Sequence, residues 1–217
     1  MKRPIATQKS IVGFALALSA AAVAPGCAQD GEPADPATVE TATLTDSNAL
    51  LQAHCPHDVP AALNPPVDAT LAAALPARGV QIYTCAIPAA GGAPAWTLKA
   101  PHAVLGKGHD VEAIHFAGPS WQANDGSLVT ATRVASAPAP DTTDIPWLLL
   151  QAATHTGAGV FTPVTLIQRL ATEKGVAPAT GCDDAHVGAE VLVPYAADYF
   201  FYRTAADGER IRQCATR

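Results

Sequence analysis

Short apolar and alternating runs recur along the chain from about residue 80, separated by residues that favour turns. Runs rich in β-branched and aromatic residues, with turns between them, predict the strands of a sandwich or barrel. The runs span residues 80–87, 96–100, 111–116, 128–134, 147–153, 164–170, 187–193, 199–204 and 210–214. Tight turns are expected at 124–127, which reads Asn-Asp-Gly-Ser, and at Asp207-Gly208, because Asp-Gly tolerates the positive φ angles of hairpins.

Helical periodicity is scarce by comparison. Residues 47–54 and 68–75 are each compatible with one or two helical turns. Because long helices do not alternate with the expected strands, a doubly wound α/β fold is disfavoured. We therefore predict a mainly β fold for residues 51–217, a single antiparallel β-sandwich or barrel-like domain with one or two short helices.

Aromatic residues are concentrated near the end of the expected strands, between residues 195 and 202. On a strand, Tyr199 and Phe201 point to one face while Phe200 and Tyr202 point to the other. A central strand that is buried on both faces has this pattern, and core packing is the favoured interpretation. A stacking platform for a sugar or another flat ligand is the alternative, and Trp121 allows the same two interpretations.

The first 26 residues have the pattern of a secretory leader. Lys2, Arg3 and Lys9 precede an apolar stretch that runs from Ile11 to Ala24. About 14 helical residues span about 21 Å, which is short of the ~30 Å hydrocarbon core of a bilayer. We expect residues 1–26 to act as a signal peptide rather than as a membrane span.

The residues before Cys27 resemble the lipobox of bacterial lipoproteins, in which a small residue precedes the lipidated cysteine. The segment reads Ala24-Pro25-Gly26-Cys27, and we expect lipid on Cys27. The protein would then be an outer-membrane lipoprotein that faces the periplasm or the cell surface. The alternative is ordinary cleavage nearby, for example after Ala28, which would leave a soluble periplasmic or secreted protein.

Residues 27–50 are expected to form a disordered acidic tether. They contain five acidic residues, no basic residue and few bulky apolar groups, so burial cannot offset the entropy of ordering them. Without its leader, the chain has 10 basic against 19 acidic residues, a charge of about −9. That charge argues against binding to nucleic acid or to anionic membrane surfaces, which leaves the lipid anchor as the expected membrane contact.

Five cysteines are an odd number, which leaves one thiol unpaired in an oxidising compartment. If Cys27 carries lipid, four remain: Cys55, Cys85, Cys182 and Cys214. Export favours two disulfides among these four, and three pairings are possible. None of them has the Cys-x-x-Cys spacing of a thiolate zinc site.

Motifs for metals, cofactors and catalysis are weak. His109 and His115 share a strand face but lie about 20 Å apart at ~3.3 Å per residue, too far to share an ion. No G-x-S-x-G elbow occurs, and the glycine-rich start at Gly157 has Thr162 where a dinucleotide fingerprint ends on glycine. We expect neither a metal nor a cofactor, and catalytic activity is not favoured.

Six segments carry a family resemblance, and they occur in the family's order. They are GVQIYTC (79–85), HFAGPSWQANDGS (115–127), IPWLLLQA (145–152), VTLIQRLAT (164–172), AP…C (177–182) and VPYAADYFFY (193–202). Together they resemble the family catalogued as domain of unknown function 3455, exported proteins of bacteria and fungi. Because these segments include Cys85 and Cys182, the resemblance implies a Cys85–Cys182 disulfide. Cys55 and Cys214 lie outside the segments and would then form the second bond.

Some fungal members of that family carry the label malate dehydrogenase. Such an enzyme needs a glycine-rich turn that opens a helix and cradles phosphate, a His–Asp pair, and arginines for the dicarboxylate. This chain has no such turn and few candidate helices. We reject the label for this protein.

The sequence therefore favours a binding module that takes an unknown small molecule, a glycan or an envelope protein. The alternatives are an exported, hydrolase-like enzyme whose site is built from dispersed His, Asp, Arg and Tyr residues, or an inhibitor of an envelope enzyme. The candidate ligand-binding residues lie within the family-like segments: His115, Trp121, Asp125, Arg169, Tyr195 and Tyr199.

Overall fold

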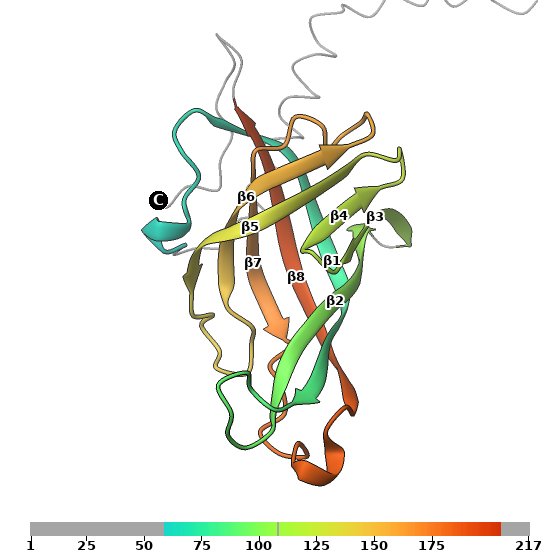
Figure 1. Cartoon of the computed structure of the whole chain (residues 1–217). Helices are drawn as coiled ribbons and strands as arrows, with labels where there is room; N and C mark the ends of the chain where they lie inside the picture. The colour runs from blue at the N-terminus through green and yellow to red at the C-terminus, as the bar shows by residue number, and fades with distance from the viewer. Residues whose placement is uncertain (1–58, 108, 205–217) are drawn as a thin grey trace, which may run out of the picture.

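A computed structural model describes residues 59–107 and 109–204, in which eight antiparallel strands close into a barrel (Figure 1). Each strand pairs with the next one along the chain, and the last strand closes the barrel by pairing with the first. The strands are β1 (Ala69–Ala86), β2 (Ala95–Lys107), β3 (Asp110–Phe116), β4 (Ser120–Ala123), β5 (Leu128–Ala137), β6 (Trp147–Thr156), β7 (Leu166–Lys174) and β8 (Glu190–Thr204). Two short 3-10 helices, η1 (Ala61–Leu63) and η2 (Asp184–His186), complete the described part. The predicted mainly β, barrel-like fold is confirmed.

Three local expectations need correction. Residues 68–75 are not helical, because β1 begins at Ala69 and its small side chains pair with the aromatic strand β8, as Ala73 does with Phe201. Tertiary pairing thus overrides the helix propensity of alanine. The runs expected at 187–193 and 199–204 merge into one strand, β8, which begins only at Glu190, and the short strand β4 was not anticipated.

Several expectations fall on residues outside those the structure describes. They are the signal peptide at 1–26, the lipid site Cys27, the tether at 27–50, the helical turns at 47–54, Cys55, Asp207-Gly208, the strand at 210–214 and Cys214. Within the described residues, no helix has the length and apolar character needed to span a bilayer.

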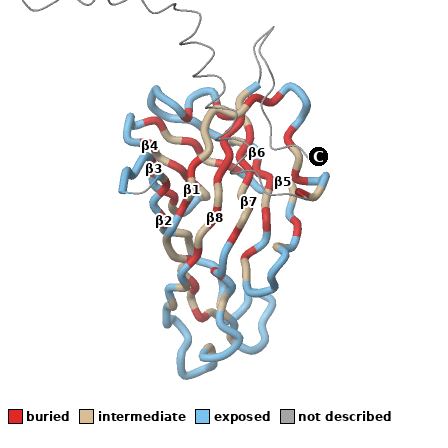
Figure 2. Tube along the Cα trace, turned by 180° about the vertical axis from the view of Figure 1, so that it is seen from behind, coloured by how far each residue is buried: buried red, intermediate tan, exposed pale blue. Residues whose placement is uncertain are grey.

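The aromatic strand β8 is buried on both faces, as its sequence predicted. Tyr199 and Phe201 belong to the core inside the barrel, whereas Phe200 and Tyr202 belong to a second core on the outside. The segment before β1 covers this outer face, and its Leu63 is fully buried there. Figure 2 shows that buried positions gather in one half of the barrel, while the loops at the other end are exposed.

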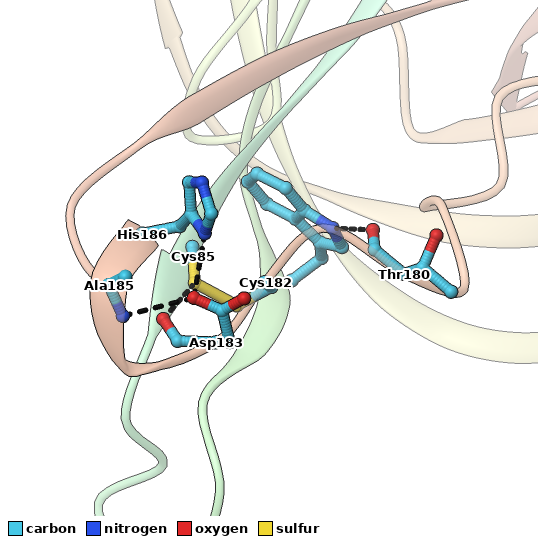
Figure 3. The surroundings of a disulfide bond; sticks show 7 residues. Cys85, Thr180, Cys182, Asp183, Ala185 and His186 are labelled. Atoms are coloured by element: carbon cyan, nitrogen blue, oxygen red, sulfur yellow. Dashed lines mark hydrogen bonds and ion pairs between the residues drawn. A yellow bond between two sulfur atoms is a disulfide. The ribbon is translucent and has the colours of Figure 1, made fainter.

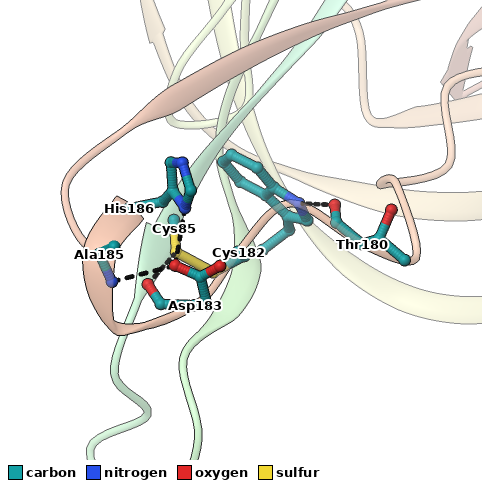
Figure 4. A network of polar contacts seen from close by, with 7 residues as sticks. Cys85, Thr180, Cys182, Asp183, Ala185 and His186 are labelled. Atoms are coloured by element: carbon teal, nitrogen blue, oxygen red, sulfur yellow. Dashed lines mark hydrogen bonds and ion pairs between the residues drawn. A yellow bond between two sulfur atoms is a disulfide. The ribbon is translucent and has the colours of Figure 1, made fainter.

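A disulfide between Cys85 and Cys182 links the end of β1 to the β7–β8 loop (Figure 3). The Cα atoms of the two cysteines are 5.3 Å apart, and 97 positions separate them in the sequence. Asp183 organises the loop beside the bond, because its Oδ1 accepts hydrogen bonds from the Ala185 amide (3.0 Å) and lies 2.6 Å from Nδ1 of His186 (Figure 4). The pairing implied by the family resemblance is confirmed.

Candidate functional site

The barrel wall has a window between β2 and β5, because the two strands between them are short. β3 pairs with β2 only over residues 103–107 of β2, and β4 pairs with β5 only over residues 128–130 of β5. Within the described residues, the first half of β2 and the second half of β5 therefore have no strand between them. The β3–β4 turn bounds the window at one end, where the Pro119 carbonyl accepts a hydrogen bond from the Ala131 amide (3.1 Å). Figure 1 shows β3 and β4 as short arrows between the longer strands β2 and β5.

A cavity of about 420 Å³ lies behind this window. Its rim is formed by the edges of β2 and β5 and by the β3–β4 turn: Leu98, Lys99, Pro101, Gly118 and Arg133. Its inner surface comes from inward-facing positions of six strands, β1, β3, β4, β6, β7 and β8: Gln81, His115, Trp121, Leu150, Arg169 and Tyr199. Strand alternation places these side chains inside the barrel, because residues two apart on a strand share a face.

Two stacked rings form one side of the cavity. His115 on β3 and Trp121 on β4 are cross-strand partners, and their rings stack with centroids 4.4 Å apart and planes 7° apart. Tyr199 meets both rings edge-on, at 5.2 Å from His115 and 5.6 Å from Trp121. The three rings come from three different strands and meet inside the barrel. The fold itself therefore positions this aromatic cluster.

His115 is buried and neutral at physiological pH. Burial is the main cause that lowers its pKa from 6.5 to about 4; the Ser120 carbonyl raises the value and the charge of Arg169 lowers it. Its Nδ1 lies 2.8 Å from the Ser120 carbonyl oxygen, so in the neutral ring this nitrogen carries the proton and donates it. The other ring nitrogen, Nε2, is then the hydrogen-bond acceptor of the imidazole.

Arg169 supplies a positive charge next to two buried phenols. Its Nε and Nη2 donate to the Pro146 carbonyl at 3.2 and 2.8 Å, and its charge acts on the nearby Tyr199 phenol. The hydroxyls of Tyr195 and Tyr199 are 3.5 Å apart. Burial raises the pKa of both phenols while the charge of Arg169 lowers it, and the net upward shift keeps both groups protonated at neutral pH.

Two hydrogen-bond donors that line the cavity lack partners. Gln81 and Trp121 are each only 1% exposed, yet Nε2 of Gln81 and Nε1 of Trp121 have no partner among the described residues. Buried polar groups in folded proteins are almost always hydrogen-bonded, because an unpaired donor costs about 1–3 kcal/mol. Thr70 Oγ1 and Trp147 Nε1, which lie outside the cavity lining, are unpartnered in the same way, so the two lining donors mark this site only in combination with its charge.

The charge of the cavity lining is one-sided. Arg133 and Arg169 line it, and neither has a carboxylate partner among the described residues. Lys99 at the rim is paired with Glu190 at 2.5 Å. No aspartate or glutamate belongs to the described lining, so the site presents donors and positive charge without an internal counter-ion.

Asp125 lies apart from the other candidate residues, in the turn between β4 and β5. Its Oδ1 accepts from the amide and hydroxyl of Ser127 (2.9 and 2.6 Å), and its Oδ2 accepts from the Val160 amide (2.7 Å). The Ser127 hydroxyl is the main cause that lowers the pKa of the Asp125 carboxyl. Asp125 therefore joins the β4–β5 turn to the β6–β7 loop and does not line the cavity.

The other five candidate ligand-binding residues lie in or beside the cavity. Four of them, His115, Trp121, Arg169 and Tyr199, line the cavity, and Tyr195 contacts Tyr199 behind it.

Sequence reasoning missed Gln81 and Arg133. Gln81 lies on the inward face of β1 with Tyr83 and Cys85. A polar glutamine among these inward-facing residues was the signal that could have identified it as a lining residue. Arg133 continues the inward row that begins with Val129 and Ala131, and nothing local marked it as a lining residue.

Comparison with known proteins identifies a family but no characterised relative. A family model described as "Protein of unknown function (DUF3455)" matches residues 65–203, which is nearly all of the described barrel. No curated protein and no solved structure matches the chain.

Proposed function

The chain belongs to the family of proteins of unknown function DUF3455, and we propose that its barrel is a module that binds a small molecule in the cavity behind the β2–β5 window. The observation that carries the proposal is the cavity of about 420 Å³, whose lining brings the stacked rings of His115 and Trp121 together with Arg133 and Arg169. A cavity that combines an apolar and aromatic surface with a few convergent polar groups is typical of ligand sites.

The chemistry of the lining favours binding over catalysis. Several polar groups with shifted pKa values do converge, which is a feature that enzymes share. The directions of these shifts keep His115 neutral and both phenols protonated, so these groups act at neutral pH as hydrogen-bonding partners. Among the described lining residues, no carboxylate stands beside the imidazole to make an acid–base pair.

We also propose that the module is exported and held to the envelope by lipid on Cys27. The proposal rests on the leader pattern at 1–26 and on the small residue before Cys27. The Cys85–Cys182 disulfide supports it, because such bonds persist in oxidising compartments.

Calorimetric titration with two flat probes of equal size, 2-naphthoate and 2-naphthamide, tests the binding proposal. We expect saturable binding of at least one probe to the wild-type protein. Ala117→Trp should weaken it at least tenfold, because Ala117 is exposed and lines the cavity on the β3–β4 turn. Ala153→Trp is the matched control, since Ala153 is exposed on β6 and outside the lining. Absence of binding up to millimolar probe, or equal loss in both variants, would contradict the proposal.

A further inference from the structure

We infer that the ligand of this cavity is an organic anion, with a flat apolar body that lies against the stacked rings of His115 and Trp121. The inference rests on the proposed binding function and adds the chemical class of the ligand. It draws on three features of the lining: its uncompensated charge, its unpaired donors and its flat aromatic wall.

The first feature is a pair of guanidinium groups that face the same space. Arg133 on β5 and Arg169 on β7 both line the cavity, and the neighbouring strand β6 lies between them. Cross-strand pairing places Arg133 opposite Leu150 and Arg169 opposite Leu148. Arg133 is exposed, whereas Arg169 is partly buried. A partly buried cation such as Arg169 usually has an anionic partner, because removal from water is costly otherwise. Here the described lining offers none.

The second feature is the excess of donors over acceptors. Nε2 of Gln81 and Nε1 of Trp121 add two unpaired N–H groups to the two guanidinium groups. Tyr199 belongs to the same wall, and its hydroxyl is already paired with that of Tyr195 at 3.5 Å. An oxyanion supplies several acceptor lone pairs at one point, and arginine binds such groups in a bidentate manner.

The third feature sets the shape of the rest of the ligand. The stacked rings of His115 and Trp121 are nearly parallel, at 7°, and Leu148 and Leu150 add apolar surface from β6. A ring or planar chain can pack against such a wall. The window between β2 and β5 gives a lateral route into this space that does not require a strand to separate.

The same two probes test this inference when their affinities are compared. 2-Naphthoate and 2-naphthamide have nearly the same shape, but only the first is an anion at pH 7. We expect wild-type protein to bind the naphthoate at least tenfold more tightly. Arg133→Gln should reduce that preference to about threefold or less while naphthamide affinity stays within twofold. Arg78→Gln removes the same charge from an exposed site outside the lining and should keep the full preference.

The outcomes separate the two proposals. Equal affinity for both probes, or tighter binding of the amide, would overturn the anion assignment while leaving a binding cavity in place. A similar loss of naphthoate affinity in Arg133→Gln and Arg78→Gln would also overturn it, because general electrostatic attraction would then explain the preference. Binding of neither probe would overturn the binding function and the anion assignment together.

Discussion

His115 is a buried lining residue of the cavity whose protonation also affects the stability of the fold. Its ring is 3% exposed, stacks on Trp121 and donates to the Ser120 carbonyl. Burial outweighs the opposing effect of the Ser120 carbonyl and lowers the pKa of His115 to about 4, which keeps the imidazole neutral. A proton that binds readily to this residue in the unfolded chain therefore binds poorly in the folded one.

The first prediction concerns the pH dependence of folding. Between pH 6.5 and 4 the unfolded chain holds more protons on His115 than the folded chain, so stability falls as pH falls through this window. The lowered pKa corresponds to a loss of about 3 kcal/mol in the free energy of unfolding. Urea unfolding of wild-type protein at steps from pH 7.5 to 4 measures it.

The control for this prediction is His115→Phe. The variant keeps a flat ring beside Trp121 but has no group that titrates at this position, so its stability should change much less between pH 6.5 and 4. It also leaves the Ser120 carbonyl without its donor, which lowers stability by an amount that does not depend on pH. Parallel pH profiles for the two proteins would contradict the assignment of the slope to His115.

Local sequence identified some lining residues and not others for a physical reason. His115 and Trp121 are six positions apart and meet across one tight hairpin, so a single motif contains both. Gln81 and Arg133 reach the same cavity only through barrel closure, and no short segment contains both residues. Asp125 was selected from the same motif as His115, but its carboxylate is used by the Ser127 and Val160 amides of nearby loops.

At the scale of elements, the disulfide joins the end of β1 to the β7–β8 loop near one end of the barrel. The 97-residue separation of Cys85 and Cys182 makes the bond a strong restraint on the unfolded chain. In the chain-entropy model a loop of about 100 residues contributes about 4–5 kcal/mol. We expect the double variant Cys85→Ala/Cys182→Ala to lose about 4 kcal/mol of unfolding free energy, as measured by urea denaturation without reductant.

Reduction of the wild-type protein provides the comparison for the double variant. Dithiothreitol should bring the wild-type stability down to that of the variant or below it. A further loss when the variant itself is reduced would indicate a second disulfide, in line with the expected Cys55–Cys214 pair. A double variant as stable as the oxidised wild type would contradict the role assigned to the bond.

The segment before β1 acts as a cover for the outer face of β8. Leu63 is fully buried in the outer core with Phe200 and Tyr202. Its carbonyl accepts a hydrogen bond from Gln168 Nε2 at 2.5 Å, and Gln168 in turn accepts from the Tyr202 hydroxyl at 2.7 Å. The sequence pattern predicted a strand buried on both faces, but it gave no sign of which segment provides the outer cover.

Leu63→Ala tests this cover. Removing a buried leucine side chain leaves a void, and we expect a loss of about 3 kcal/mol in unfolding free energy by urea denaturation. Ala62→Ser, at an exposed neighbouring position, should change stability by less than about 0.5 kcal/mol. Equal effects of the two substitutions would show that the segment does not pack as a core element.

Element boundaries departed from expectation where pairing outweighs local preference. The alanine-rich start of β1 suits a helix in isolation, but Ala73 and Ala74 lie in register with Phe201 and Phe200 of β8. Small residues there leave room for the large aromatic side chains of the partner strand. Neighbours that are more than a hundred residues away therefore decide the state of this segment.

At the scale of the whole molecule, closure distinguishes the barrel from a sandwich. The pairing of β1 with β8 runs from Ala69↔Thr204 to Thr84↔Glu190. Strand alternation is the same in both architectures, so the sequence predicted the strands but left sandwich and barrel as alternatives. The unequal strand lengths open the window, since β3 and β4 cover only part of the gap between β2 and β5.

The last prediction concerns the proposed lipid anchor of this barrel, which rests on Cys27. If Cys27 carries diacylglycerol, the mature chain begins at that residue, because signal peptidase cleaves before the lipidated cysteine. Two acyl chains, at ~0.8 kcal/mol for each buried CH₂, give stable anchoring where one chain gives only marginal binding. We expect wild-type protein to fractionate with membranes and to be released by detergent, whereas Cys27→Ser is processed poorly and lacks lipid.

Intact mass spectrometry of the purified protein distinguishes the alternatives. A mass that matches residues 27–217 plus lipid supports the anchor, and Ala28→Ser, which leaves the cysteine in place, should give the same modification. An unmodified chain that begins elsewhere and stays in the soluble fraction would contradict lipidation. The proposal of export would still stand in that case, because the leader pattern and the Cys85–Cys182 pair that support it do not depend on the anchor.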